Sequence, residues 1–306
     1  MNVLDPRFGG VLRERLAVLD PPLSIARTWR HSRNTVLYEL VDAGGGRHIA
    51  KAYRSKPAEY LAAEYRVLRE LAQAWGDDGD VSAVAPTWID EELGVLATRL
   101  APGASLQRLL VERNRRDARG AHAAELREMV RAAAAALHRF HALYHAGDAD
   151  GAPASLRYID FNPVNLLYRR EGDAWRVTLL DVPEVRETAD VRLDVGTFCF
   201  ELARIGLHPA HIRSYDHRAV PALKEAFLQA YFGHWGRAPG AEDRAAVRAA
   251  ELARGAAVRG WYRRFWAYRS NPAVEAAKAA WFLPLLRAYF ARLPAAPAYP
   301  ARAAAS

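Results

Sequence analysis

The sequence predicts an α+β fold in two lobes, and its hydrophobic periodicity carries that prediction. Alternating apolar and polar positions, typical of strands, recur between residues 24 and 100. Beyond that point the apolar residues recur with the 3.6-residue period of helices. Hydrophobic residues make up 51% of the chain and charged residues 25%, which suits a globular protein. We therefore expect a small antiparallel-sheet lobe at residues 1–100 and a mostly helical lobe at residues 101–306.

The expected first lobe is a sheet of about five strands that carries one helix. Strands are expected at 25–29, 35–41, 48–53, 84–89 and 94–100. The glycines of 43–46 tolerate the turn that joins the second strand to the third. From Pro57 to Trp75 the leucine and tyrosine spacing changes to a helical period, which predicts a helix across the sheet.

The expected second lobe is built from helices, with a hairpin near its beginning. Helices are expected at 106–111 and 121–144, and over most of the chain from residue 191 onward. Residues 145–155 are rich in Gly, Asp, Ala and Pro, which predicts a loop. The runs 165–168 and 176–180 are apolar and flank a Glu-Gly-Asp turn, which predicts a short hairpin.

Charge and special residues limit the classes of ligand and location. With 43 basic and 35 acidic residues, the formal net charge is +8, which favours anionic ligands without choosing among them. The single cysteine, Cys199, excludes an internal disulfide and a cysteine-based metal site. No run approaches the ~20 apolar residues of a membrane span, and the first residues lack the build of a signal peptide. We expect a cytoplasmic protein without a transmembrane segment, and no nucleic-acid partner, since no recognised binding module is present.

A lysine and a glutamate in the first lobe have the pattern of a phosphate-binding pair. Lys51 lies in the middle of the third expected strand, between two alanines, so its ammonium group projects from one face of the sheet. Glu64 follows thirteen residues later inside the expected helix. A strand lysine held by a helix glutamate can fix the phosphates of a nucleotide. An exposed lysine and a solvated glutamate would explain the same two residues.

The stretch Tyr158-Ile-Asp-Phe-Asn-Pro-Val-Asn-Leu-Leu-Tyr168 is more specific. Asp160 and Asn165 are five positions apart, separated by a proline-containing turn, and lead into an apolar strand. The carboxylate can accept or orient a hydroxyl proton, and the amide oxygen can bind magnesium. The hairpin then delivers Asp181 at the end of a buried strand, where an unpaired carboxylate would be costly unless it bound a metal ion.

These residues resemble the aminoglycoside/choline-kinase-type phosphotransferases of the protein-kinase-like superfamily, and the resemblance covers about residues 24–235. It implies ATP and Mg²⁺ as cofactors and transfer of the γ-phosphoryl group to a hydroxyl. Asp160 then matches the catalytic residue, while Asn165 and Asp181 match the metal ligands. Lys51 and Glu64 fall at the positions of the family's nucleotide-binding pair.

Further positions resemble the nucleotide grip of that family. The run Thr98-Arg-Leu-Ala-Pro-Gly-Ala-Ser-Leu106 is similar to the hinge, which implies that adenine bonds to backbone around Arg99 and Leu100. The hairpin that covers the phosphates, residues 29–35, contains no glycine, so Ser32 and Asn34 are its candidate phosphate donors. Asp194 matches a helix aspartate that supports the catalytic loop.

Other positions depart from the protein kinases. Tyr158 replaces a histidine common in the superfamily, and Asn162 stands where Ser/Thr protein kinases have lysine. Only twelve residues separate Asp181 from Asp194, too few for a long activation segment. These features favour a small-molecule or glycan acceptor, such as a sugar, an amino alcohol or a lipopolysaccharide-type glycan, over a protein.

The sequence leaves several alternatives open. A catalytically silent kinase-like scaffold, a protein kinase, and an enzyme that transfers AMP instead of phosphate would share these residue types. Helices at 259–269 and 281–293 interleave arginines with aromatic residues, which fits plain packing, an anionic acceptor or contact with an anionic membrane surface. A cationic acceptor needs free carboxylates, for which Asp216 is the best placed candidate in the sequence.

Overall fold

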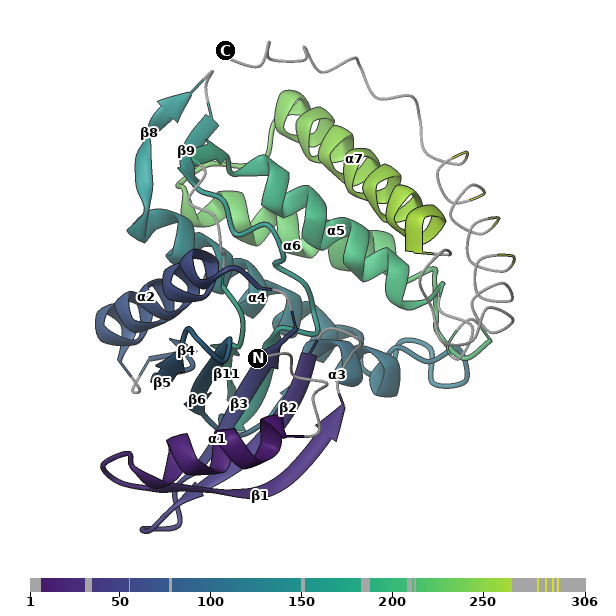
Figure 1. Ribbon diagram of the computed structural model, residues 1–306. Helices are drawn as coiled ribbons and strands as arrows, with labels where there is room; N and C mark the ends of the chain where they lie inside the picture. The colour runs from purple at the N-terminus through teal and green to yellow at the C-terminus, as the bar shows by residue number, and fades with distance from the viewer. Residues whose placement is uncertain are drawn as a thin grey trace. The chain divides into compact units, whose positions relative to one another are not determined.

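The computed structural model describes residues 7–30, 35–54, 56–76, 79–149, 152–182, 188–207, 211 and 213–265, with the single positions 280, 284, 288 and 291 (Figure 1). The chain forms two compact units. Unit 1 contains Met1–Gly103 and Leu167–Arg186, and unit 2 contains Ala104–Leu166 and Glu187–Ser306.

Unit 1 contains the five-stranded sheet that the periodicity predicts. Its strands are β1 (Leu23–Arg30), β2 (Thr35–Asp42), β3 (Arg47–Tyr53), β5 (Pro86–Asp90) and β6 (Val95–Arg99). They lie in the order β1-β2-β3-β6-β5, and every neighbouring pair is antiparallel. The helix α2 (Ala58–Trp75) packs against the sheet through its buried leucines, which confirms the expected sheet and the helix predicted from residues 57–75.

One helix of unit 1 was not expected from the sequence. The helix α1 (Phe8–Ala17) buries Phe8, Leu12 and Leu16 in one hydrophobic cluster with Ala50 and Ala52 of β3. Two adjacent glycines in its first turn lower the helix propensity, and no side chain caps its start, so sequence patterning gave no helix signal there. Because side chains alternate along a strand, α1 covers the face of β3 opposite to Lys51.

A second group of strands completes unit 1. These strands are β4 (Val81–Ala83), β10 (Leu166–Glu171) and β11 (Ala174–Leu179), and β11 pairs in parallel with β4. The hairpin of β10 and β11 is the one predicted from the two apolar runs, and it places Asp181 just beyond the end of β11. A Cβ atom at Gly103, whose φ is +128°, would lie 2.6 Å from the carbonyl oxygen of Tyr168, so only glycine fits there.

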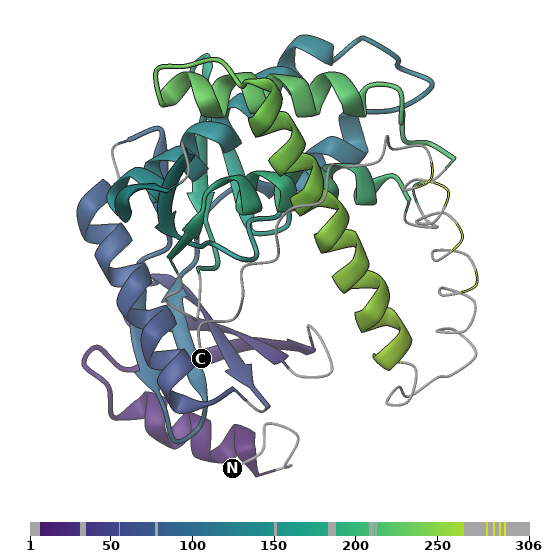
Figure 2. The same cartoon turned by 90° about the horizontal axis from the view of Figure 1, so that it is seen from above.

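Unit 2 is mostly helical. Its helices are α3 (Leu106–Arg113), α4 (Ala123–Leu143), α5 (Arg192–Ile205), α6 (Val220–His234) and α7 (Ala241–Phe265). The helix α4 packs on α6, and α5 packs on α7, the long light-green helix of Figures 1 and 2. Within the described part of the chain, no helix is both long and apolar enough to span a bilayer.

The expected loop at residues 145–155 is wrong. The strands β8 (His145–Ala149) and β9 (Ala152–Leu156) form a hairpin, and β12 (Thr188–Asp190) pairs with β9 on its other side. The backbone pairing of these three short strands outweighs their turn-like composition. A short strand β7 (Ala104–Ser105) precedes α3, and the hydroxyl of Ser105 accepts a hydrogen bond from the backbone N–H of Arg108.

The contact of α5 with α7 depends on a glycine. A Cβ atom at Gly196 would lie 2.5 Å from the Cβ of Ala250 and 2.6 Å from the carbonyl oxygen of Val247, so the helices meet at backbone distance. We expect Gly196→Ala to lower the free energy of unfolding by about 1–3 kcal/mol, because the added methyl overpacks the seam. Urea denaturation measures this change in the free energy of unfolding.

The matched control is Gly233→Ala in α6, where an added Cβ meets no atom within 4 Å. There alanine gains helix propensity without a clash, so stability is expected to rise by up to about 1 kcal/mol. Changes of the same sign in both variants would contradict the close packing at Gly196.

Candidate active site

A lysine and an aspartate from distant parts of the chain meet in unit 1. Lys51 of β3 donates from Nζ to Oδ1 of Asp181 at 2.8 Å, across 130 positions of sequence. Burial opposes ionisation of Asp181, but the positive charge of Lys51 outweighs it and holds the pKa of that carboxyl below its usual value. Both of these predicted site residues are therefore brought together, with the carboxylate ionised.

Glu64 of α2 lies beside this pair and is almost completely buried. Its Oε2 accepts hydrogen bonds from the ammonium group of Lys56 and from the hydroxyl of Tyr53. Burial, and next the charge of Asp181, raise the pKa of Glu64 to about 7. Sequence reasoning missed Lys56, since a lysine one position before the proline that starts a helix carries no recognised motif.

The geometry around Asp181 suits a magnesium ion. The carboxylate stands at the open end of β11 with 36% of its side chain exposed, and carboxylate oxygens are ligands that Mg²⁺ prefers. Oε1 of the neighbouring Glu64 is buried and has no hydrogen-bond partner among the residues that the structure describes. The charge of Asp181 raises the pKa of Glu64, so the two carboxylates lie close together, and a cation bound beside them would offset their repulsion.

The hinge predicted to bind adenine lies at the end of β6. The N–H of Arg99 donates to Ala85 O at 2.9 Å, and the N–H of Leu100 donates to Arg47 O at 2.8 Å. Both donors are already used inside unit 1, so these two residues could offer an adenine only their carbonyl oxygens. A hollow of about 190 Å³ adjoins the hinge on the side of β4, and neither Lys51 nor Asp181 lines it.

Two predicted phosphate donors cannot be placed. Ser32 and Asn34 lie outside the residues that the structure describes. The same holds for most of the basic and aromatic segment beyond residue 265. Their assignments therefore stay predictions.

In unit 2, a buried aspartate holds the loop that contains Asp160. Asp194 of α5 is 1% exposed and accepts hydrogen bonds from the backbone N–H groups of Tyr158, at 2.6 Å, and Ile159, at 3.0 Å. His141 lies 3.2 Å away through Nε2, and its Nδ1 is 2.7 Å from the hydroxyl of Tyr231. This network gives Asp194 the supporting geometry that the resemblance implies.

The same loop is strained next to the candidate catalytic residue. Ile159 has φ of +67°, the left-handed region that β-branched residues avoid. The carboxylate of Asp194 fixes the N–H of this residue, so the surrounding bonds maintain the strain. Strain of this kind concentrates at functional sites. We therefore infer that the strained backbone serves to fix the position of Asp160.

The turn after Asp160 is built by an asparagine. Oδ1 of Asn162 accepts from the N–H of Val164 at 2.9 Å, and the N–H of Asn165 donates to Asn162 O at 3.0 Å. The side-chain amide of Asn165 then donates to the carbonyl oxygen of Asp160 at 3.2 Å. The loop thus brings Asp160 and Asn165 together, as predicted, and Asn162 has a structural role in it.

An arginine that the sequence did not indicate contacts Asp160. Nη2 of Arg254, on α7, lies 2.9 Å from Oδ1 of Asp160. The same guanidinium contacts Glu201 of α5, with Nε and Nη2 each 3.2 Å from Oε1. Glu201 is buried and also pairs with Arg204. No sequence signal links Arg254 to Asp160, because 94 positions separate them.

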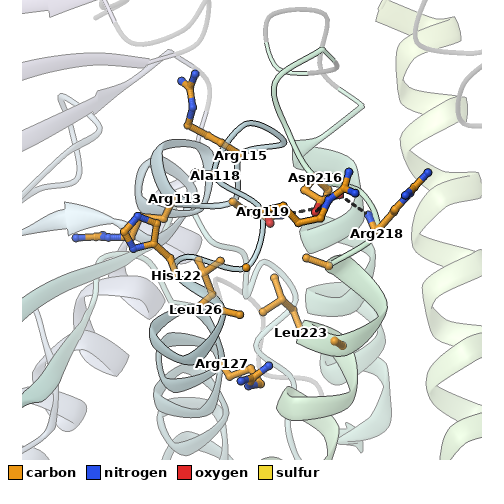
Figure 3. Close-up of a pocket in the computed structure, with 15 residues that line it drawn as sticks. Arg113, Arg115, Ala118, Arg119, His122, Leu126, Arg127, Asp216, Arg218 and Leu223 are labelled. Carbon is orange, nitrogen blue, oxygen red and sulfur yellow. Dashed lines mark hydrogen bonds and ion pairs between the residues drawn. The ribbon is translucent and has the colours of Figure 1, made fainter.

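The acidic residue singled out for a cationic acceptor is engaged elsewhere. Asp216 is buried and its Oδ2 accepts from Nε of Arg119 at 3.0 Å. It lines a hollow of about 240 Å³ between α3, α4 and α6, shown in Figure 3. There Arg115 and Arg218 point away from the hollow, and Asp160 does not line it. Across the described ranges, no group of three or more His, Cys, Asp or Glu residues could form a metal centre of its own.

The fold is decided by comparison with solved structures. An ADP-bound aminoglycoside phosphotransferase, APH(2'')-Ib, superposes with a TM-score of 0.50 at 10% identity, over 93% of this chain and 97% of that one. The chain has the protein-kinase-like fold. The macrolide 2'-phosphotransferase MphH of Brachybacterium faecium gives 0.49 at 19% identity over 91% and 99%. A glucosamine kinase gives 0.43 at 14% identity over 92% and 100%.

No family model and no curated protein matches the sequence. The predicted site residues lie in two clusters, Lys51 with Asp181 in unit 1, and Asp160 with Asn165 on a loop that Asp194 supports in unit 2. The sequence indicated a role for neither Lys56 nor Arg254, and their contacts were identified from the structure alone.

Proposed function

We propose that this protein is an ATP- and Mg²⁺-dependent phosphotransferase that moves the γ-phosphoryl group to a hydroxyl of a small molecule or glycan. The observation that carries the proposal is the 2.8 Å contact of Lys51 with Asp181. A packing role would not require an ammonium group and an ionised carboxylate to meet at the end of a strand. Phosphoryl transfer requires both, one for the phosphates and one for the metal ion.

In this proposal Lys51 binds the α- and β-phosphates, and Asp181 and Asn165 hold Mg²⁺. The bound metal ion supplies positive charge that offsets the charge of the transferring phosphoryl group. Glu64 keeps the charges around Lys51 balanced, since it lies beside Asp181 and pairs with Lys56. The hinge at Arg99 and Leu100, with Ser32 and Asn34 of the hairpin, completes the proposed nucleotide grip.

Asp160 is the proposed catalytic residue. Its carboxylate accepts the hydrogen bond of the acceptor hydroxyl and orients it for attack on the γ-phosphorus. More than half of its side chain, 57%, is exposed, so an acceptor can reach it. The strained backbone of Ile159 and the backbone hydrogen bonds that Asp194 accepts keep the carboxylate of Asp160 in place while the hydroxyl binds.

A small acceptor is favoured over a protein. Only twelve residues separate Asp181 from Asp194, too few for a long segment that binds a peptide. The position of the lysine found in Ser/Thr protein kinases is held by Asn162, whose side chain forms the turn. The proposal places the protein in the cytoplasm, where ATP is supplied. The choice of ATP over GTP rests on the resemblance alone.

The direct test is acceptor-dependent ADP release with Mg²⁺ over a panel of sugars, amino alcohols and lipopolysaccharide fragments. Asp160→Ala is expected to lower kcat by about 10²–10⁴-fold, since it removes the group that orients the hydroxyl. Asp173→Ala is the matched control, because this aspartate lies exposed in the turn between β10 and β11. Equal turnover by the Asp160→Ala variant and the wild type would refute the assigned role.

Two further measurements separate the alternatives. Calorimetric titration with MgATP that shows no binding at millimolar nucleotide would favour a silent scaffold. A product heavier by AMP instead of by one phosphoryl group would show that the transferred group is different.

A further inference from the structure

The acceptor class can be read from the partners of Arg254 in unit 2. Its guanidinium bridges the exposed carboxylate of Asp160 and the buried carboxylate of Glu201. Because Glu201 is nearly inaccessible to solvent, it acts as a fixed anchor for the arginine. The backbone contact at Gly196 fixes α7 against α5, which sets where Arg254 stands. Arg254 is therefore a rigidly placed cation beside the proposed catalytic residue.

The guanidinium of Arg254 has donors left over. An arginine carries five N–H donors in a planar fork. The contacts of Arg254 involve Nε and Nη2, and within the described ranges Nη1 has no hydrogen bond. About a quarter of the side chain, 27%, is exposed. Two N–H groups are thus available to a ligand that also reaches Asp160, and guanidinium groups bind carboxylate and phosphate most strongly.

Four carboxylates of unit 2 that could serve a polycationic acceptor are already paired with arginines. Asp216 pairs with Arg119, and Glu225 with Arg244. Asp243 pairs with Arg237, and Glu242 lies 3.4 Å from Arg192. A cationic acceptor at Asp160 would also meet the positive charge of Arg254 at close range, which costs binding energy.

We propose that Arg254 selects an acceptor that carries an anionic group, a carboxylate or a phosphate, near the hydroxyl to be phosphorylated. In the complex, Nη1 binds the anionic group while the hydroxyl donates to Asp160, whose carboxylate Arg254 also orients. This inference rests on the proposed function and adds its substrate class. Arg254 is in this sense both a positioning residue for Asp160 and a specificity determinant.

The test compares acceptors in which one substituent of the sugar is neutral, cationic or anionic. Glucose, glucosamine, glucuronate and glucose 6-phosphate share one ring, and both ADP release and direct binding by calorimetry are measured with each. For the binding arm the protein is saturated with a non-hydrolysable MgATP analogue, so no turnover is needed. We expect glucuronate or glucose 6-phosphate to bind at least about tenfold more tightly than glucose and glucosamine, through a charge-assisted hydrogen bond.

Variants of α7 then assign the preference to one side chain. Arg254→Gln is expected to raise KM and Kd for the anionic sugar about tenfold or more, while the values for glucose change less than about threefold. Arg254→Lys keeps the positive charge but lacks the planar set of N–H donors of a guanidinium. It is expected to retain part of the preference that Arg254→Gln loses. Arg244 lies on α7 as well and pairs with exposed Glu225 of α6, so Arg244→Gln is expected to leave the preference unchanged.

Two outcomes would overturn the inference. One is that neither anionic sugar binds more tightly than glucose. The other is that Arg254→Gln weakens glucose and the anionic sugar equally, as a purely structural role would. Absence of MgATP binding is a different result. It would refute the proposed nucleotide-dependent function, and it would not bear on the acceptor class.

Discussion

Asp194→Ala is expected to destabilise the protein by about 3–5 kcal/mol and to lower kcat by about 10²-fold. The carboxylate is buried and accepts from two consecutive backbone N–H groups, so its removal leaves both donors without partners at about 1–3 kcal/mol each. His141 loses its contact with Asp194 as well and keeps the one with Tyr231. Asp160 would then lose its fixed position, and a misplaced catalytic group can cost about 10²-fold in rate. Urea unfolding and ADP release below the melting temperature measure the two effects.

A substitution at the neighbouring Ile159 separates the effect of backbone strain from the effect of the hydrogen bonds to Asp194. Ile159→Gly removes the side chain that makes φ of +67° unfavourable, without touching the N–H that donates to Asp194. Stability is expected to hold or to rise by up to about 1 kcal/mol, since glycine adopts this region freely but loses more entropy on folding. A loss of several kcal/mol on Ile159→Gly would contradict the strain, and full activity in Asp194→Ala would contradict the supporting role.

Lys51→Met is expected to reduce kcat/KM for ATP by about 10²–10³-fold, the cost of removing one preorganised charge from a transition state. Nucleotide affinity is expected to fall as well, because the side chain would no longer contact phosphate. The variant also removes the cation that holds the pKa of Asp181 low, so binding of Mg²⁺ should weaken near neutral pH. Steady-state kinetics and titration of MgATP measure the changes.

Lys56→Met is the matched control for Lys51. Lys56 pairs with buried Glu64, and its side chain is itself almost buried. Its loss should cost stability, because breaking a buried ion pair leaves one charge uncompensated. Glu64 limits this cost by taking up a proton, as its pKa is already about 7. If Lys56→Met impaired turnover as much as Lys51→Met at full folding, the two lysines would share one role.

The periodic elements were predictable because their signals are local. The strands of the first sheet, the helix α2 and the hairpin of β10 and β11 each follow from alternation or helical spacing within one short window. The loop from Asp160 to Asn165 was predictable because its polar groups, its proline and the strand that follows lie within a few residues of one another. A residue pattern of this density indicates a candidate site without any tertiary information.

The rest could not be predicted, because it depends on distances that the sequence does not contain. Lys56 pairs with Glu64 only because the chain bends into α2, and Arg254 reaches Asp160 only because α5 and α7 meet at Gly196. The pairing of β8, β9 and β12 joins short segments with turn-like composition, so long-range backbone bonds decide their structure. Helix α1 begins with two glycines, so its tertiary burial outweighs its propensity.

Helix α1 also affects electrostatics on the face of the sheet that it does not touch. Phe8, Leu12 and Leu16 pack on Ala50 and Ala52, which places a dry, weakly polarisable layer directly behind Lys51. A low-dielectric wall on one side concentrates the field of a charge on the other and excludes counter-ions from behind it. The pull of Lys51 on an anionic ligand should therefore persist at ionic strengths that screen the exposed arginines of unit 2. A helix that contributes no side chain to the proposed site would thus set the range over which Lys51 attracts an anionic ligand.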